Sequence, residues 1–225
     1  MRFLSTILTV CALASCAAVT PNADPNSDAP EHPPAATRVA GLPGSYEAAL
    51  ETWRTAEDVN DWIAARFEYD LPRAAKLSES QRAQVGRIDI HAPELFFANP
   101  SGVCVDLARF AVETLRAVDP ASRPIYLMME FDPVVMSGNT LRRHWVASYQ
   151  RDGRLYFFAD SKRPGHVAGP YTTVKQFIDE YAMYRGRRIV SYKDLESYER
   201  KLKTQVPRAI RDERALYLPS DRADR

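Results

Sequence analysis

The sequence has almost no excess charge of either sign, and several motifs that would mark a partner are missing. Its 30 basic and 29 acidic side chains give a net charge of +1, so no global field would draw phosphate backbones or acidic lipid headgroups. No histidine, cysteine and carboxylate cluster has metal-ligand spacing, and no glycine-rich loop suggests phosphate binding. We therefore expect no nucleic-acid partner, no metal and no cofactor.

Disorder and internal repeats are equally poorly supported. The chain is 45% hydrophobic and 26% charged, which lies within the ordinary globular range. Its 225 residues allow one domain, or one domain with appendages.

The sequence also lacks an apolar run near its start that is long enough to span a bilayer. Arg2 precedes the apolar run Phe3–Ala14, which has signal-peptide length. The following "LASC", Leu13–Cys16, resembles a bacterial lipoprotein signal in which a lipidated Cys16 becomes the first residue. The alternative is an ordinary signal peptide cut after a small residue. Because Ala17 follows instead of aspartate, we expect an outer-membrane lipoprotein facing the periplasm, anchored by its N-terminal lipid.

Cysteine is scarce, and this scarcity makes one position conspicuous. Of the three cysteines, Cys11 would be removed with the signal and Cys16 would be blocked by lipid. Cys104 would remain as a lone thiol in an oxidising compartment, where cysteines are normally paired. The presence of a lone thiol in such a compartment suggests that Cys104 has a chemical role.

The chain divides into four parts by composition. We expect a signal peptide over 1–15, a lipidated cysteine and flexible proline-rich tether over 16–43, a domain over 44–205 and a C-terminal tail over 206–225.

Within the domain, hydrophobic periodicity predicts two helices from about residue 46, with Ser45 as the first cap and Thr55 with Asp58 as a capping box. The pattern stops at Leu71–Pro72. Further elements are expected in the following order: a short helix at 78–85, a helix from Cys104 to Asp119–Pro120, strands in 123–131, 144–150 and 154–160, and helices at 171–184 and 195–203. This order gives an α+β fold.

Cys104 is predicted to stand at the N-terminus of a helix, after Ser101, Gly102 and Val103. Unpaired backbone N–H groups and the positive end of the helix dipole stabilise a thiolate there, and the same groups can hold a tetrahedral oxyanion. Gly102 would keep the approach to the sulfur free. The alternative is a buried cysteine that acts only as a small hydrophobe.

A nucleophilic cysteine needs a base, and His144 and Asp160 are the candidates for base and orienting acid. A two-residue Asp152–Gly153 turn would place His144 and Asp160 on opposite faces of the hairpin and remove the dyad. A three-residue loop, 151–153, would set them directly across from each other. Both registers are compatible with the sequence, and function favours the second.

These segments together resemble a known superfamily. The stretches "PSGVCVDLARFAVETLRAV", "RPIYLMM" and "HWVASYQRDGRLYFFADS" resemble the transglutaminase-like superfamily, including its bacterial cysteine-proteinase branch. The resemblance covers about residues 59–161. It implies a papain-like fold in which N-terminal helices and a catalytic helix pack on an antiparallel sheet.

The resemblance also implies site roles: Cys104 as nucleophile, His144 as general base and Asp160 as orienting acid. Asp106 matches an acidic residue of the family pattern and is expected to be structural, partly neutralised by Arg109. Asn99 is the first candidate for an additional oxyanion donor, ahead of Tyr69 and Trp62. His91 and His166 are rival bases.

We expect a monomeric enzyme that transfers or hydrolyses peptide or protein amides of the cell envelope, with hydrolysis favoured over cross-linking. Two alternatives stay open: a catalytically silent lipoprotein that binds an envelope partner in the papain-like groove, and a scaffold with an inert buried cysteine.

Overall fold

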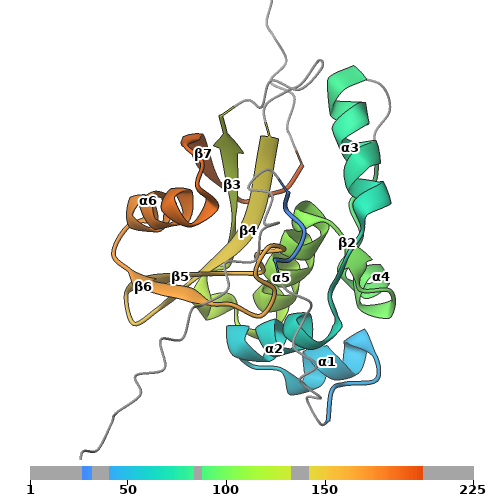
Figure 1. The fold of residues 1–225 in the computed structure, drawn as a ribbon. Helices are drawn as coiled ribbons and strands as arrows, with labels where there is room; N and C mark the ends of the chain where they lie inside the picture. Colours follow the sequence, from blue (N-terminus) through green and yellow to red (C-terminus); the bar gives the residue numbers. More distant parts are fainter. Residues whose placement is uncertain (1–26, 32–40, 84–87, 133–141, 200–225) are drawn as a thin grey trace, which may run out of the picture.

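The computed structural model describes residues 27–31, 41–83, 88–132 and 142–199, which form an α+β fold (Figure 1). The helices are α1 (Tyr46–Thr52), α2 (Ala56–Arg66), α3 (Leu71–Ala83), α4 (Pro93–Ala98), α5 (Cys104–Val118), the short 3-10 helix η1 (Pro120–Ser122) and α6 (Val174–Arg185). The strands are β1 (Glu68–Tyr69), β2 (Ser101–Gly102), β3 (Ile125–Phe131), β4 (Arg142–Arg151), β5 (Arg154–Phe158), β6 (Ala168–Tyr171) and β7 (Ile189–Leu195).

Five strands form the main sheet in the order β6-β5-β4-β3-β7, and every neighbouring pair is antiparallel. β4 lies at the centre and places His144 opposite Met129 of β3. A separate parallel pair, β1 with β2, leads directly into α5. These elements bring Cys104, the first residue of α5, close to His144 of β4.

Alternation along the strands feeds two cores on opposite faces of the sheet. Tyr126, Ala147 and Phe158 belong to the first core, which contains α1, α2, α4 and α5. Side chains of opposite parity form the second core under α6, namely Leu127, Met129, Phe131, Val146 and Phe157. Because successive strand residues point to opposite faces, β3, β4 and β5 each contribute to both cores.

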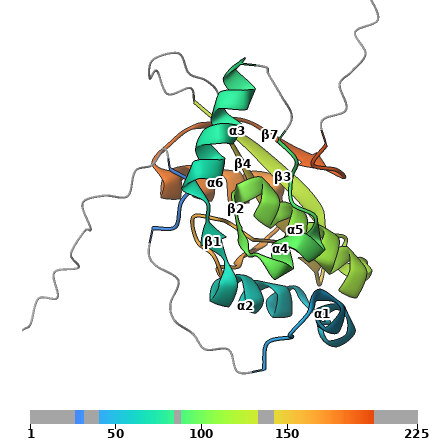
Figure 2. The same ribbon diagram turned by 90° about the vertical axis from the view of Figure 1, so that its right-hand side faces the viewer.

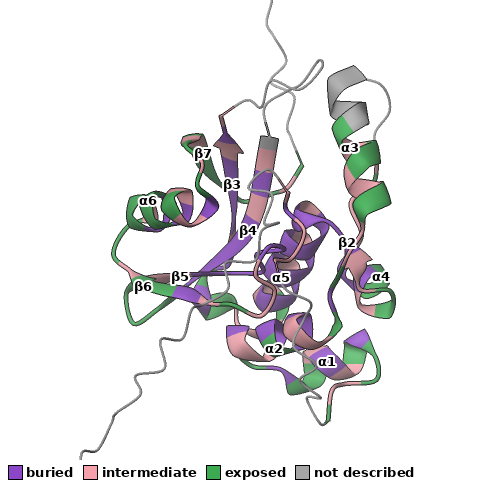
Figure 3. Ribbon diagram, in the orientation of Figure 1, coloured by how far each residue is buried: buried purple, intermediate pink, exposed green. Residues whose placement is uncertain are grey.

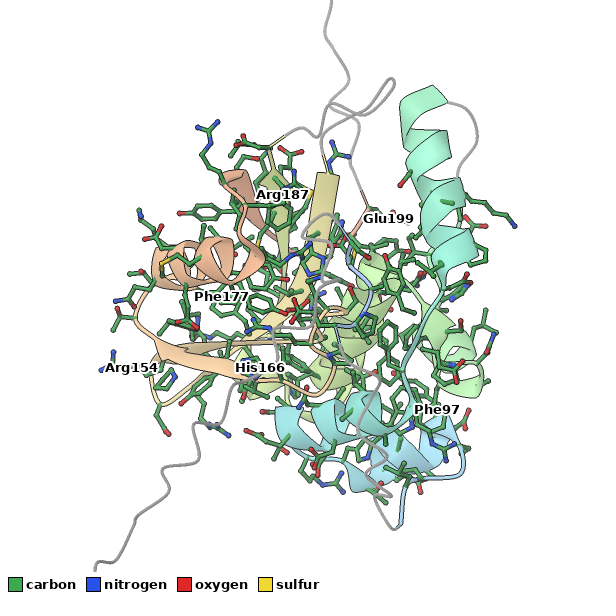
Figure 4. All side chains as sticks on the ribbon, in the orientation of Figure 1. Phe97, Arg154, His166, Phe177, Arg187 and Glu199 are labelled. Atoms are coloured by element: carbon green, nitrogen blue, oxygen red, sulfur yellow. The ribbon has the colours of Figure 1, made fainter. Side chains whose placement is uncertain are left out.

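The figures show this two-sided arrangement. α6 lies on one side of the sheet and α5 on the other, and the central strands β3 and β4 between them are largely buried (Figures 1 and 3). The helices α1, α2, α4 and α5 gather on a common side, as the turned view shows (Figure 2). Phe97 in α4 packs against the first core and Phe177 in α6 belongs to the second core (Figure 4). Phe177 stacks on Phe157 with 3.9 Å between ring centroids, which fixes α6 on the sheet.

Local sequence signals explain most element boundaries. Ser45 Oγ accepts a hydrogen bond from Ala48 N, and Thr55 forms a capping box with Asp58, so both predicted caps are confirmed. The α+β class and the antiparallel sheet are confirmed as well.

Two element predictions are wrong. Leu71–Pro72 begins α3 instead of ending helical structure, because proline is tolerated in the first turn of a helix. Leu195 ends β7, an unpredicted strand that pairs with β3, and no helix covers 195–199. The remainder of that predicted helix, 200–203, lies outside the described residues.

None of the helices in the described ranges is both long and apolar enough to cross a membrane. The predicted signal peptide, Cys16 and the tail over 206–225 lie outside the described residues.

Candidate active site

Cys104 is the first residue of α5 and is 7% exposed. Val103 precedes it and is the N-cap of α5, with an extended backbone. Gly102 of β2 lies against Phe96 of α4. The predicted placement of the thiol at a helix N-terminus is confirmed. Such a position directs the positive end of the helix dipole toward the sulfur.

Asp106 fixes the start of this helix. Its carboxylate accepts hydrogen bonds from Val103 N at 3.0 Å and His91 N at 2.9 Å, and both oxygens accept from Arg73 at 2.7 Å. The structural role expected for Asp106 agrees with these contacts. Arg109, however, pairs with Glu113, so the predicted neutralisation of Asp106 by Arg109 is wrong. Arg73 supplies the charge from α3, which spacing in α5 could not indicate.

Gly102 has a different role from the expected one. A Cβ added there would lie 2.9 Å from Asp106 Cβ and 2.9 Å from Phe96 Cε2. The glycine therefore allows β2 to approach α4 and α5 closely, which is a packing requirement.

His144 and Asp160 meet directly. His144 Nε2 lies 3.0 Å from Asp160 Oδ1, and both side chains are buried. The hairpin nevertheless has the two-residue register, since Ala147 pairs with Phe158 and Arg151 with Arg154. The favoured three-residue loop is therefore wrong. The inference that the two-residue register would remove the dyad is wrong too.

Ala159 resolves this conflict. It follows the last residue of β5 and has a left-handed backbone, with φ at +56°. Phe158 and Ala159 consequently lie in the same core, whereas an uninterrupted strand would send them to opposite faces. This break in the alternation turns Asp160 to the face that carries His144.

Asp160 is held as a carboxylate by several donors. Tyr181 Oη donates to Oδ1 at 3.0 Å, Lys162 N donates to Oδ1 at 3.0 Å, and Arg163 Nε donates to Oδ2 at 3.2 Å. Burial raises the pKa of Asp160, but His144, Arg163 and the Lys162 N–H outweigh it and hold that pKa well below its usual range.

The loop after Asp160 is attached to α2. Asn60 Nδ2 donates to Gly165 O at 2.7 Å. Gly165 has φ at +84°, and an added Cβ would lie 2.5 Å from Ala64 Cβ, so only glycine fits against the helix.

The other nitrogen of His144 faces a residue that the sequence did not single out. Asp28 Oδ1 lies 3.3 Å from His144 Nδ1, at ion-pair distance without an aligned hydrogen bond. Burial lowers the pKa of His144, but Asp28, Asp160 and Cys104 raise it more, so it lies well above 6.5. His144 therefore lies between two carboxylates that favour its protonated form, and its ring stacks on the Tyr181 ring with 5.7 Å between centroids.

Asp28 belongs to the docked segment, Ser27–Glu31, which lies within the predicted tether. The sequence predicts a flexible tether over 16–43, yet this segment packs against the site, and Asp28 is 6% exposed. The prediction of a flexible tether does not account for these residues. Asp28 stands among prolines and small polar residues, so neither periodicity nor a motif marks it.

Cys104, His144 and Asp28 converge. Their ligand atoms, the Cys104 sulfur, one His144 nitrogen and one Asp28 oxygen, all lie within 4.8 Å of one another. Sulfur, imidazole and carboxylate are ligand types that zinc accepts. Arg185, however, places Nη2 2.8 Å from Asp28 Oδ1 and opposes a cation there.

The other residues predicted from the sequence, namely the oxyanion candidates and the rival bases, make contacts outside the Cys104–His144–Asp28 cluster. Asn99 caps the end of α4, is exposed, and lines a cavity of about 270 Å³ together with Asp70, Arg73, Lys76, His91 and Ser101. No contact found in the described residues joins Asn99 to the Cys104 sulfur, and its oxyanion role stays a prediction. Trp62 stacks on Phe97 in the first core. His91 N donates to Asp106, and Asp160 is paired with His144 instead of either rival base.

One family model and a solved structure show similarity to this chain. A solved structure of calcium-bound LapG from Legionella pneumophila aligns with a TM-score of 0.38 and 13% identity, covering 70% of this chain and 78% of that one. No curated protein matches the sequence significantly. The family model of the transglutaminase-like domain matches residues 48–190, more than half of the chain, including Cys104, His144 and Asp160. By this match the chain belongs to the transglutaminase-like domain family.

Proposed function

We propose that this protein is a thiol-dependent enzyme that transfers or hydrolyses acyl groups at peptide or protein amide bonds. The observation that carries the proposal is the position of the His144 ring, with Asp160 at 3.0 Å on one nitrogen and the cluster containing the Cys104 sulfur beside it. Family membership supports a thiol nucleophile at this position.

In the proposed reaction, the Cys104 thiolate adds to the amide carbonyl carbon and an electron pair moves onto the carbonyl oxygen. Backbone N–H groups at the start of α5 would stabilise that oxyanion. When the C–N bond breaks, His144 gives its proton to the leaving nitrogen and a thioester is left on Cys104.

Hydrolysis completes the cycle. Water adds to the thioester carbonyl as His144 accepts a proton, and the C–S bond then breaks to release the carboxylic acid and the thiolate. An amine could replace water and would give a new amide. We favour hydrolysis, because water is always available to a small domain with no evident amine site.

The decisive test compares Cys104 with and without its base. We expect iodoacetamide to modify Cys104 of the wild type at pH 6 about tenfold faster than in His144→Gln, with both rates assigned to Cys104 by peptide mapping. A free-cysteine peptide gives the unactivated rate, and circular dichroism checks folding. Equal rates in the two proteins would contradict an activated nucleophile and favour the partner-binding alternative.

A second experiment addresses substrates. Envelope proteins from cells that carry the wild type are compared with those from cells that carry Cys104→Ala. We expect new termini or altered side-chain amides only with the wild type. Identical profiles together with an unactivated thiol would exclude catalysis.

Localisation is a separate part of the proposal. We propose lipidation at Cys16 and attachment to the outer membrane, on the basis of the "LASC" sequence and Ala17. Incorporation of labelled palmitate into the wild type but not into Cys16→Ala is expected. Labelling of both, or of neither, would contradict it.

A further inference from the structure

The docked segment is held at the site largely through its main chain. Ser27 O accepts from Lys162 Nζ at 3.1 Å and from Arg185 Nη2 at 3.2 Å, Asp28 O accepts from Ser161 Oγ at 2.8 Å, and Glu31 N donates to Lys162 O at 3.3 Å. Figure 1 shows the segment in blue beside α5 and β4. Main-chain contacts of this kind accept any extended peptide, and side-chain pockets then provide selectivity.

One side chain provides the anchor. The Asp28 carboxylate accepts a hydrogen bond from Arg185 Nη2 at 2.8 Å and lies 3.3 Å from His144 Nδ1. The Asp28 side chain is 8% exposed and that of Arg185 is 1% exposed. A charge-assisted hydrogen bond between two buried groups is selective, because a neutral ligand would replace the ion pair with a weaker neutral hydrogen bond.

The surrounding charges favour an anion at this point. Arg185 in α6 and Lys162 in the loop after Asp160 both bring buried cationic groups to the docked segment, and His144 Nδ1 lies 3.3 Å from Asp28 Oδ1. Asp160 is already engaged by His144, Tyr181 and Arg163. The cationic groups around Asp28 therefore form a subsite for a carboxylate next to the Cys104 sulfur.

We propose that Arg185 forms a subsite for an acidic side chain of the substrate peptide, and that Asp28 occupies this subsite in cis as an intramolecular competitor. The inference rests on the proposed function, since it assigns a substrate class to the same site. It also accounts for the poor exposure of Cys104 in a chain whose site is filled by its own segment.

The first test uses the full-length protein. Cys104 in Asp28→Ala should react with iodoacetamide about tenfold faster than in the wild type, the size expected for loss of one charge-assisted hydrogen bond that holds the segment. Glu31→Ala is the matched control, because the Glu31 carboxylate lies 3.6 Å from Lys162 Nζ while its main-chain hydrogen bond to Lys162 O is kept in the variant. This variant should change the rate less than about twofold. Equal rates for the wild type and Asp28→Ala would overturn the competitor role.

The second test adds the ligand in trans to Asp28→Ala. A capped peptide with the sequence of residues 25–31, PNSDAPE, should slow the labelling of Cys104, and PNSNAPE should require about tenfold more peptide for the same protection. Equal protection by the two peptides would overturn the acidic subsite.

A third protein locates the discrimination. Arg185→Gln in the Asp28→Ala background should protect equally with both peptides. Arg185→Lys, which keeps the positive charge, should retain part of the preference if the glutamine variant fails to fold. A preference that persists unchanged in the folded glutamine variant would assign the subsite to another residue and overturn the proposal.

The outcomes separate this inference from the proposed function. If Cys104 of Asp28→Ala is exposed but reacts at pH 6 no faster than a free-cysteine peptide, the enzymatic proposal fails. The peptide preference would still be measurable as a difference in protection, and the subsite would stand as a binding site.

Discussion

His144 Nε2 lies 3.0 Å from Asp160 Oδ1 although the hairpin register would place their side chains on opposite faces. The left-handed Ala159 makes the contact possible by breaking the alternation after β5. The pairing therefore depends on the backbone conformation of Ala159.

Ala159→Val should destabilise the protein and weaken the His144–Asp160 contact. A β-branched residue at positive φ costs about 1–2 kcal/mol. Ala147→Val is the matched control, because Ala147 is equally buried in the same core but lies in β4. Urea unfolding should show the larger loss at position 159. An equal loss in both variants would mean that overpacking alone, and not backbone strain, accounts for the effect.

Asp106→Asn should be strongly destabilising. The carboxylate is fully buried and accepts two bonds from Arg73, and removing one partner of a buried ion pair costs about 3–5 kcal/mol. Glu113→Gln serves as the control, since the half-exposed pair with Arg109 should contribute less than about 1 kcal/mol. Chemical denaturation measures both. Similar small losses would show that Arg73 finds other partners.

Gly102→Ala should cost about 1–3 kcal/mol, because the new methyl group would meet Asp106 Cβ and Phe96 at 2.9 Å and the start of α5 would have to shift. Gly44→Ala, where an added Cβ meets nothing within 4 Å, should change stability by less than about 1 kcal/mol. Thermal unfolding of the two variants tests this. A neutral Gly102→Ala would show that α4 can move away.

Asp28→Asn should lower the pKa of His144. Burial lowers this pKa and three neighbours raise it; among those that raise it, the charge of Asp28 is the largest. NMR titration of the His144 ring measures the shift, and Glu31→Gln should leave it unchanged. An unaltered titration of His144 would contradict the assigned cause.

The difference in unfolding free energy between the wild type and Asp28→Asn should depend on pH. A pKa that is raised in the folded state stabilises fully below the unfolded value of 6.5, and this stabilisation is lost as pH rises through the folded pKa. The wild type should therefore exceed Asp28→Asn in stability most at about pH 5.5, below the ordinary histidine pKa. The difference should shrink at alkaline pH.

Local chemistry made much of the fold predictable. The capping residues Ser45, Thr55 and Asp58 predicted the starts of the first two helices, and Asp152–Gly153 predicted the turn of the hairpin. Asp152 and Gly153 both have positive φ, as a two-residue hairpin turn requires. The candidate site residues were predicted from their residue types and their order along the chain, and the structure brings Cys104 and His144 close together.

What could not be predicted depends on contacts distant in sequence. Alanine has no preference for positive φ, so nothing marks Ala159 before the packing around it is known. Arg73 reaches Asp106 from 33 residues away, and Asp28 reaches Arg185 from 157 residues away. β7 was not predicted because most of its residues are exposed or only partly buried, so its sequence has no clear hydrophobic alternation. Its pairing with β3 makes it an edge strand.

The bond from Asn60 to Gly165 and the tight fit of Gly165 on Ala64 join α2 to the loop that carries Asp160. As a result, the position of Asp160 depends on helix α2 as well as on the β4–β5 hairpin. A tilt of α2 would be transmitted to the carboxylate, so substitutions on this helix would change the alignment of Asp160 with His144.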